Sequence, residues 1–167
     1  MPLLTLGIGS NINPQENIRR AVKALATRFP GIRCSSVYES EAIGFDGDNF
    51  LNLVAVAESE DPLPMIMDYL KSLEDELGRD RTQPKFSGRT MDIDILSYGD
   101  NNGEEVGIEL PRDEILKHAF VLRPLAELLP DTLHPAEKVS YAQLWSRFDQ
   151  QSQTLWPVDF DWRDSLG

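Results

Sequence analysis

The sequence predicts an α+β fold, in which helices pack on a mainly antiparallel sheet. Two observations carry this prediction: strand and helix patterns follow each other in the order β-α-β-β-α-β, and no helix separates the second strand from the third. Parallel neighbours need a crossover of a dozen or more residues, so this pair is expected to be antiparallel. A length of 167 residues corresponds to about one domain, and we expect residues 1–167 to form it.

Apolar periodicity places the elements of the first half of the chain. Strands are expected at 3–9, 32–39 and 50–58. The strand at 32–39 is expected to place Ile32, Cys34, Ser36 and Tyr38 on one face. Helices are expected at 14–29, where Pro14 takes the first helical position, and at 62–77, which ends before Gly78.

The second half begins with a polar stretch, 79–90, and continues with a strand at 91–96. A Gly- and Asn-rich turn at 99–103 follows, and we expect it to join this strand in a hairpin with the segment up to Leu110. Residues 111–130 and 139–148 are expected to be helical.

The charge balance limits the classes of partner. Lys and Arg number 16 against 28 Asp and Glu, so the formal net charge is −12, which argues against broad binding to nucleic acid or to an anionic membrane. No segment approaches the roughly 20 apolar residues of a membrane span. One cysteine and two histidines exclude an internal disulfide and a Cys/His zinc cluster. Because the first residues do not resemble a secretory leader, we expect a soluble, cytoplasmic protein.

A cationic segment interrupts this acidic background. Residues 79–89 contain the cations Arg79, Arg81, Lys85 and Arg89 against a single acid, Asp80. A solvated loop whose cations pair with nearby acids is the common interpretation of such a run. Because two acids follow it directly in a predicted strand, we favour a localised anion site.

Those two acids, Asp92 and Asp94, share one face of the strand, about 6.5–7 Å apart. Aspartate is depleted in strands, so two on one face carry a cost. Repelling carboxylates held this close are best relieved by a hard divalent cation such as Mg²⁺. A solvent-facing alternating strand is the alternative interpretation.

Together the two features predict a site for a nucleoside triphosphate. A metal held by carboxylates bridges phosphate oxygens, while guanidinium groups neutralise the charge that develops during transfer. No GxxxxGK[ST] motif occurs, so the site is not a P-loop. Gly7-Ile8-Gly9 is too short for a dinucleotide fingerprint, and we interpret it as close strand packing.

Several short motifs carry a resemblance to a known family. They are Gly9-Ser10-Asn11, Phe50-Leu51-Asn52, the spacing Glu74…Gly78-Arg79…Arg81, the block Gly88-Arg89-Thr90-Met91-Asp92-Ile93-Asp94-Ile95 and the run from Phe120 to Glu127. In this order, over residues 3–135, they resemble the 6-hydroxymethyl-7,8-dihydropterin pyrophosphokinases of folate biosynthesis. The resemblance implies a ferredoxin-like sandwich, which agrees with the predicted element order.

The resemblance also implies an activity: transfer of the β,γ-pyrophosphoryl group of ATP to the pterin hydroxymethyl group, releasing AMP, with two Mg²⁺ ions. Asp92 and Asp94 stand at the metal-binding positions, and Arg79 and Arg89 at those of the catalytic arginines. The implied ATP-binding residues are Glu74, Arg81, Lys85, Arg112 and His118.

A pterin pocket is implied as well. Phe50 and Phe120 stand at the ring-stacking positions, Asn52 at the position that binds the ring edge, and Ser40 and Ile43 in the loop that supplies backbone contacts. A flat heteroaromatic ring gains from stacking, and an amide both donates and accepts hydrogen bonds. For either phenylalanine alone, a core position is the alternative. Asn52 lies in an otherwise apolar strand, and a buried amide needs partners.

Three departures from the family pattern concern the substrates more than the metals. Ser40-Glu41-Ala42 stands where Thr-Pro-Pro is common, Arg112 where a histidine is usual, and His118 where an arginine is usual. The alternative function is therefore a diverged paralogue that binds a pterin or nucleotide without catalysis, or with an altered substrate. We expect ATP and a reduced pterin as partners and a monomer as the assembly, with a homodimer as the alternative.

Overall fold

The computed structural model describes residues 2–41, 49–78 and 91–162. Its strands are β1 (Leu3–Ser10), β2 (Arg33–Cys34), β3 (Val37–Ser40), β4 (Phe50–Glu58), β5 (Asp92–Tyr98) and β6 (Leu155–Val158). Its helices are α1 (Pro14–Arg28), α2 (Leu63–Glu76), α3 (Glu114–Lys117), α4 (Ala119–Leu128) and α5 (Tyr141–Arg147), with a 3₁₀ turn at Glu104–Val106. Apart from a break in the strand at 32–39, the elements expected before residue 99 are confirmed.

The described strands join one sheet in the order β5-β1-β4-β3-β6, and the short β2 pairs with β4. Every one of these pairings is antiparallel. β1 lies inside the sheet, between β4 and β5, and its residues are largely buried on both faces. The order of β5, β1, β4 and β3, with α1 and α2 as the connecting helices, is that of a ferredoxin-like α+β sandwich. The predicted fold class is confirmed.

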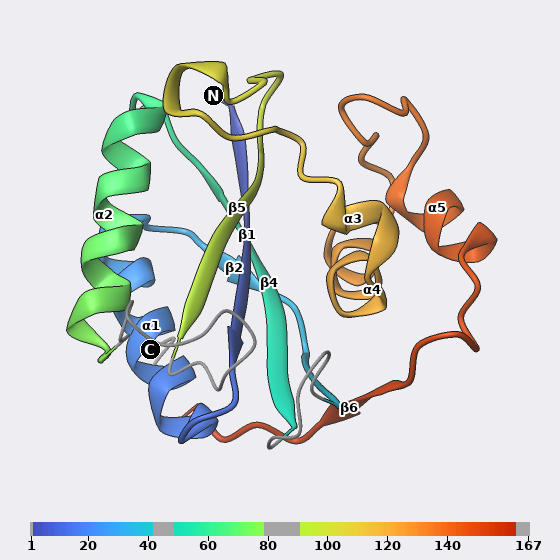
Figure 1. Cartoon of the computed structure of the whole chain (residues 1–167), viewed down its shortest axis with the longest axis horizontal. Coiled ribbons are helices and arrows are strands. Elements are labelled where there is room, and N and C mark those ends of the chain that lie inside the picture. The colour runs from blue at the N-terminus through green and yellow to red at the C-terminus, as the bar shows by residue number, and fades with distance from the viewer. Residues whose placement is uncertain (1, 42–48, 79–90, 163–167) are drawn as a thin grey trace.

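Helices cover both faces of the sheet (Figure 1). α1 and α2 pack on one face, where they bury a core that includes Leu6, Leu25 and Leu70. The helices α3, α4 and α5 cover the other face over a second core built on Val54, Leu96 and Leu122. None of the described helices combines the length and the apolar character that crossing a membrane requires.

The prediction of a hairpin between the strand at 91–96 and the segment up to Leu110 is wrong. The structure describes this whole segment, which forms a turn and the 3₁₀ helix rather than a strand. Gly103 and Gly107 adopt left-handed backbone conformations, with φ of 80° and 74°, and so curl the chain between them. A Cβ atom at Gly103 would lie 2.4 Å from the carbonyl oxygen of Ile108, so only glycine fits this curl.

Two further differences concern the C-terminal third. The helix expected at 111–130 is divided into α3 and α4 by His118, whose φ and ψ of −119° and 122° are extended. The helix expected at 139–148 is confirmed as α5. β6 was not predicted, because its four residues contain Trp156 and Pro157 and show no clear alternation.

A bulge at Ser35 corrects the expected face of the strand at 32–39. Cys34 pairs with Ala55, whereas Tyr38 pairs with Asn52, so this side of the ladder holds one extra residue. Ile32 and Cys34 therefore pack on the α1 face, while the hydroxyl of Tyr38 reaches Glu127 on α4, 2.5 Å away. The Ser35 Oγ accepts a hydrogen bond from the Val54 amide at 3.0 Å and donates one to the Ser36 carbonyl at 2.8 Å.

Replacing Ser35 with alanine should lower the free energy of unfolding by about 1–3 kcal/mol, because it leaves the buried Val54 amide without its acceptor. Urea unfolding at neutral pH measures this change. Ser146→Ala is the matched control, since the Ser146 hydroxyl is exposed and bonds only within α5. Equal stability of the two variants would contradict a structural role for the bulge.

Candidate active site

Three neighbouring strands bring predicted site residues into one row. Gly9 on β1 is paired with Asn52 on β4 and with Asp92 on β5, while Gly7 is paired with Asp94. Directly paired residues in antiparallel strands project to the same face. That face is the one covered by α4, because Val54 and Leu96, two residues beyond Asn52 and Asp94 on the same face, belong to the core beneath it.

The two glycines leave the middle of this row without side chains. A Cβ atom at Gly9 would lie 2.5 Å from Oδ1 of Asn52, closer than real contacts allow. At Gly7 the nearest atom would be a terminal carbon of Leu96, at 3.3 Å. Interpreting Gly7-Ile8-Gly9 as close packing therefore fits Gly7, whereas Gly9 makes room for the amide of Asn52.

The same-face arrangement of Asp92 and Asp94 is confirmed. Ile93 and Ile95 between and after them are buried in the core beneath α1 and α2, so both carboxylates project to the α4 face. Both aspartates are partly exposed. Carboxylate oxygens are hard donors that suit Mg²⁺, so this pair fits such an ion chemically. Within the described residues, no group of three or more potential metal ligands occurs.

Charged side chains form hydrogen bonds with backbone groups on the outer edge of β5, at Ile93 and Ile95 on either side of Asp94. The buried carboxylate of Glu74 accepts a hydrogen bond from the Ile93 amide at 2.8 Å. The Nε of Arg112 donates to the Ile95 carbonyl at 2.9 Å, and its Nη2 lies 3.8 Å from Oδ1 of Asp94. Glu74 and Arg112 thus form hydrogen bonds with the backbone of β5, the strand that carries Asp92 and Asp94, a role that the sequence does not indicate.

These neighbours set the protonation of Asp94. The pKa of this carboxyl is raised from 3.8 to about 6, and burial is the main cause of the shift. The guanidinium of Arg112 lowers the pKa of Asp94, whereas the carboxylates of Asp92, Glu114 and Glu74 raise it. A divalent cation would remove this like-charge repulsion.

The residues predicted to bind the pterin form two groups in the described structure, one around Asn52 and one at the start of α4. The Asn52 amide donates to Oγ of Ser40 at 3.3 Å, and Phe50 shares its face two residues earlier. At the start of α4, the rings of His118 and Phe120 stack with centroids 4.9 Å apart and planes 17° apart. His118 therefore contacts the predicted stacking ring, while Arg112 contacts β5 at Ile95 and Asp94.

Five predicted site residues lie outside the described part of the chain. They are Ile43, Arg79, Arg81, Lys85 and Arg89. The described site residues are Ser40, Phe50, Asn52, Glu74, Asp92, Asp94, Arg112, His118 and Phe120.

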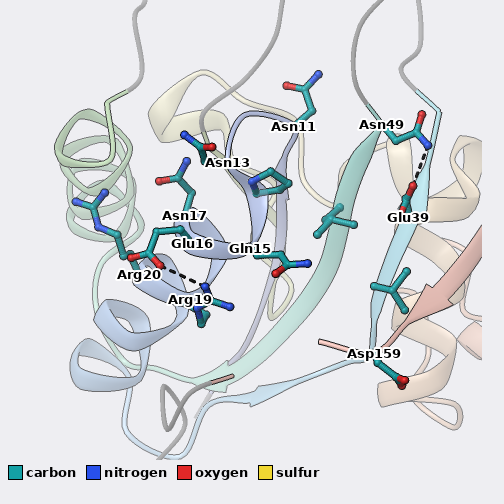
Figure 2. Close-up of a pocket in the computed structure, with 13 residues that line it drawn as sticks. Asn11, Asn13, Gln15, Glu16, Asn17, Arg19, Arg20, Glu39, Asn49 and Asp159 are labelled. Carbon is teal, nitrogen blue, oxygen red and sulfur yellow. Dashed lines mark hydrogen bonds and ion pairs between the residues drawn. The ribbon is translucent and has the colours of Figure 1, made fainter. Parts of the chain in front are cut away.

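A separate hollow of about 1150 Å³ opens on the α1 side (Figure 2). The first turn of α1 and the facing ends of β3, β4 and β6 form its walls. Asn49 donates to Glu39 across its rim at 2.9 Å, and Arg19 pairs with Glu16 at 3.3 Å. None of the described site residues lines this hollow.

A model of the 7,8-dihydro-6-hydroxymethylpterin-pyrophosphokinase (HPPK) family matches residues 5–130. The chain belongs to the HPPK family. A 2-amino-4-hydroxy-6-hydroxymethyldihydropteridine pyrophosphokinase of Synechocystis is 35% identical over 158 residues, which cover 92% of this chain and 78% of the relative. The enzyme of that name from Aquifex aeolicus is 34% identical over 137 residues, covering 81% of this chain and 85% of the relative.

Solved HPPK structures share the fold. A Plasmodium falciparum HPPK-DHPS triple mutant with SDX-DHP superimposes with a TM-score of 0.66 at 13% identity, covering 87% of this chain and 41% of that one. An HPPK-DHPS in complex with substrates gives a TM-score of 0.64 at 15% identity, covering 90% and 44%. This chain therefore spans less than half the length of those two proteins.

The stretch of β1 that lacks side chains on this face, at Gly7 and Gly9, is the feature of this HPPK-family site that the sequence analysis does not predict. A signal for it exists in the sequence. Gly7 and Gly9 are two apart in a predicted strand, as are Asp92 and Asp94, so each pair shares a face. Only the strand order places the two pairs beside each other, and pairing order is not readable from a single strand.

Replacing Asp94 with asparagine should stabilise the metal-free protein above about pH 6. The native carboxyl binds its proton more tightly than the unfolded one, so its contribution to stability is fully present below pH 3.8 and lost as the pH rises through about 6. Because 45% of the side chain is exposed, the gain should stay below about 1 kcal/mol.

Thermal unfolding in EDTA from pH 4 to pH 8 measures this effect, with Asp131→Asn at an exposed turn as the control. Added Mg²⁺ should stabilise the unmodified protein and not Asp94→Asn. A variant that is less stable than the unmodified protein at pH 8 in EDTA would contradict the cost of the Asp94 charge, which arises from burial first and from the neighbouring carboxylates second.

Proposed function

We propose that this HPPK-family chain transfers the β,γ-pyrophosphoryl group of ATP to the hydroxymethyl group of 6-hydroxymethyl-7,8-dihydropterin and releases AMP. The observation that carries this proposal is the row Asn52–Gly9–Asp92, which crosses three strands on one face. Two strand spacings separate Asn52 from Asp92, about 10 Å. That distance suits a flat ring bound at one end and phosphates bound at the other.

At the acceptor end, the side chains supply stacking and hydrogen bonds. Phe120, backed by His118, offers a ring face to the pterin, and Phe50 stands at the second stacking position. Asn52 and Ser40 offer an amide and a hydroxyl to the ring edge. Because Gly9 has no side chain, the amide of Asn52 lies over β1, and a ring bound to this amide would present its hydroxymethyl group toward Asp92.

At the phosphate end, Asp92 and Asp94 would hold two Mg²⁺ ions, which align the phosphates and neutralise their charge when bound. The guanidinium of Arg112, held by the Ile95 carbonyl, adds a fixed positive charge beside Asp94. We further propose that Arg79, Arg81, Lys85 and Arg89 neutralise the phosphates from the segment before β5.

In the reaction, the hydroxymethyl oxygen forms a bond to the β-phosphorus while the bond between that phosphorus and the α,β-bridging oxygen breaks. AMP keeps the bridging oxygen, and the hydroxyl proton is lost. Little covalent participation by protein groups is needed, since positioning and charge neutralisation supply most of the acceleration of phosphoryl transfer.

Formation of AMP from ATP, with and without the reduced pterin, tests the function. The unmodified protein should release AMP only when the pterin and Mg²⁺ are both present. Asp92→Asn should reduce turnover by at least about 10³-fold, because it removes one of two charges that bind the metal, while Asp131→Asn should not. Pterin binding without AMP formation would instead identify a non-catalytic relative.

Gly9→Ala should raise the KM for the pterin by about tenfold or more, because the new methyl group displaces the amide of Asn52. Gly7→Ala is the matched control, on the same strand and face, since its methyl group meets only a flexible leucine end at 3.3 Å. The KM for ATP should change less than twofold in Gly9→Ala. Steady-state kinetics with each substrate varied in turn measures both values. Equal effects of the two substitutions on the pterin would refute the assignment of Gly9.

A further inference from the structure

The C-terminal segment 149–162 lies beyond the residues that match the family model, and it contacts three parts of the fold. It leaves α5, pairs with β3 as β6, and then passes under the end of the sheet to α1 (Figure 1). At α1, the guanidinium of Arg19 donates to the Asp161 carbonyl at 2.9 Å and lies over the ring of Phe160. Phe160 and Trp162 pack against the core beneath α1 and α2.

Gln153 joins this segment to the junction between α3 and α4. Its Oε1 accepts a hydrogen bond from the Ala119 amide at 2.8 Å, and its Nε2 donates to the Lys117 carbonyl at 2.7 Å. Ala119 is the first residue of α4, whose amides need an acceptor from outside the helix. The residue before it, His118, makes no side-chain cap, so Gln153 supplies the cap from 34 positions along the chain.

The two hydrogen bonds of Gln153 flank His118 on both sides. They hold the chain extended at His118, between the last residue of α3 and the first residue of α4. The His118 ring in turn stacks on Phe120, 4.9 Å away, in the first turn of α4. A rotation of this junction would therefore move the stacked pair as a unit.

The same segment also supports the other wall of the predicted pterin pocket. Two residues after Gln153, Leu155 pairs with Ser40 at the end of β3. Ser40 accepts the hydrogen bond of Asn52. One stretch of chain thus contacts the element that carries Phe120 and the element that carries Ser40.

We propose that Gln153 is a positioning residue for pterin binding: it fixes the α3–α4 junction and so the orientation of the stacked rings of His118 and Phe120. This inference rests on the proposed function, because it takes Phe120 as the stacking ring. Gln153 contacts neither Asp92 nor Asp94. His118, which the resemblance places among the ATP-binding residues, stacks on Phe120 in the structure, so we expect the effect of Gln153 to fall on the pterin.

The first test needs no activity. The chain has only two histidines, so the imidazole proton signals in an NMR spectrum separate into His118 and His134, assigned with His118→Asn. In ligand-free protein, Gln153→Ala should move the His118 signals, because ring stacking on Phe120 changes, and leave those of His134 in place. Gln151→Ala, an exposed glutamine two residues away, should move neither.

The second test uses kinetics. Gln153→Ala should raise the KM for the reduced pterin by about tenfold, leave the KM for ATP within twofold and lower kcat less than the KM changes. Gln151→Ala should match the unmodified protein. A loss of stability alone would lower the amount of active protein without separating the two KM values.

The outcomes separate this inference from the proposed function. If the unmodified protein forms no AMP, the function is wrong, while the NMR comparison still shows whether Gln153 positions His118. Unmoved His118 signals in Gln153→Ala would overturn the positioning role. Two kinetic results for an active Gln153→Ala variant would overturn the role of Gln153 in pterin binding. One is an unchanged KM for the pterin, and the other is an equal rise in the KM for the pterin and the KM for ATP.

Discussion

The site depends on the antiparallel register of β1 between β4 and β5. This register places Asn52, Gly9 and Asp92 in one row, with Gly7 and Asp94 two positions along. A slip of one residue in either pairing would turn one end of the row to the opposite face, beneath α1 and α2. The buried residues that alternate with this row, among them Ile8, Leu53 and Ile93, oppose such a slip because it would move their side chains out of the core. The same apolar burial that stabilises the sheet therefore aligns the polar groups.

β5 lies at one edge of the sheet, where two charged side chains and the backbone amide of Arg112, instead of another strand, form hydrogen bonds with its backbone. Glu74 accepts from the Ile93 amide and Arg112 donates to the Ile95 carbonyl. This arrangement stops further strand pairing at that edge. It also brings one negative and one positive charge to Asp94, with opposite effects on its pKa. An arginine at position 112, where the family usually has histidine, makes the positive charge permanent.

Much of this arrangement follows from local sequence patterns. The alternation around Asp92 and Asp94 predicts their common face, and the helical period predicts α1 and α2, because both signals lie within a few residues. The sequence does not reveal which charged residues satisfy the edge of β5, since Glu74 and Arg112 are about 20 positions away on either side. Nor does it reveal β6 or the cap from Gln153, which depend on contacts between segments 34 or more positions apart. The bulge at Ser35 was missed because one extra residue in a short strand leaves no periodic signal.

The backbone groups at the two edges of the sheet find partners in different ways. This difference corresponds to the two ends of the proposed site, one for phosphates and one for the pterin ring. At the β5 edge, where we propose that the metal binds, the side chains of Glu74 and Arg112 form hydrogen bonds with the backbone and leave Asp92 and Asp94 partly exposed. The opposite edge, at β3, is covered by β6 through a ladder from Val37 to Ser40. A phosphate site needs open access for a charged ligand, whereas a pocket for a flat ring needs walls that keep their spacing. Gln153 and β6 are continuous in the chain, so one segment outside the matched family region contacts both the strand that carries Ser40 and the start of α4. Under our proposal, this segment would set the spacing of the pterin pocket.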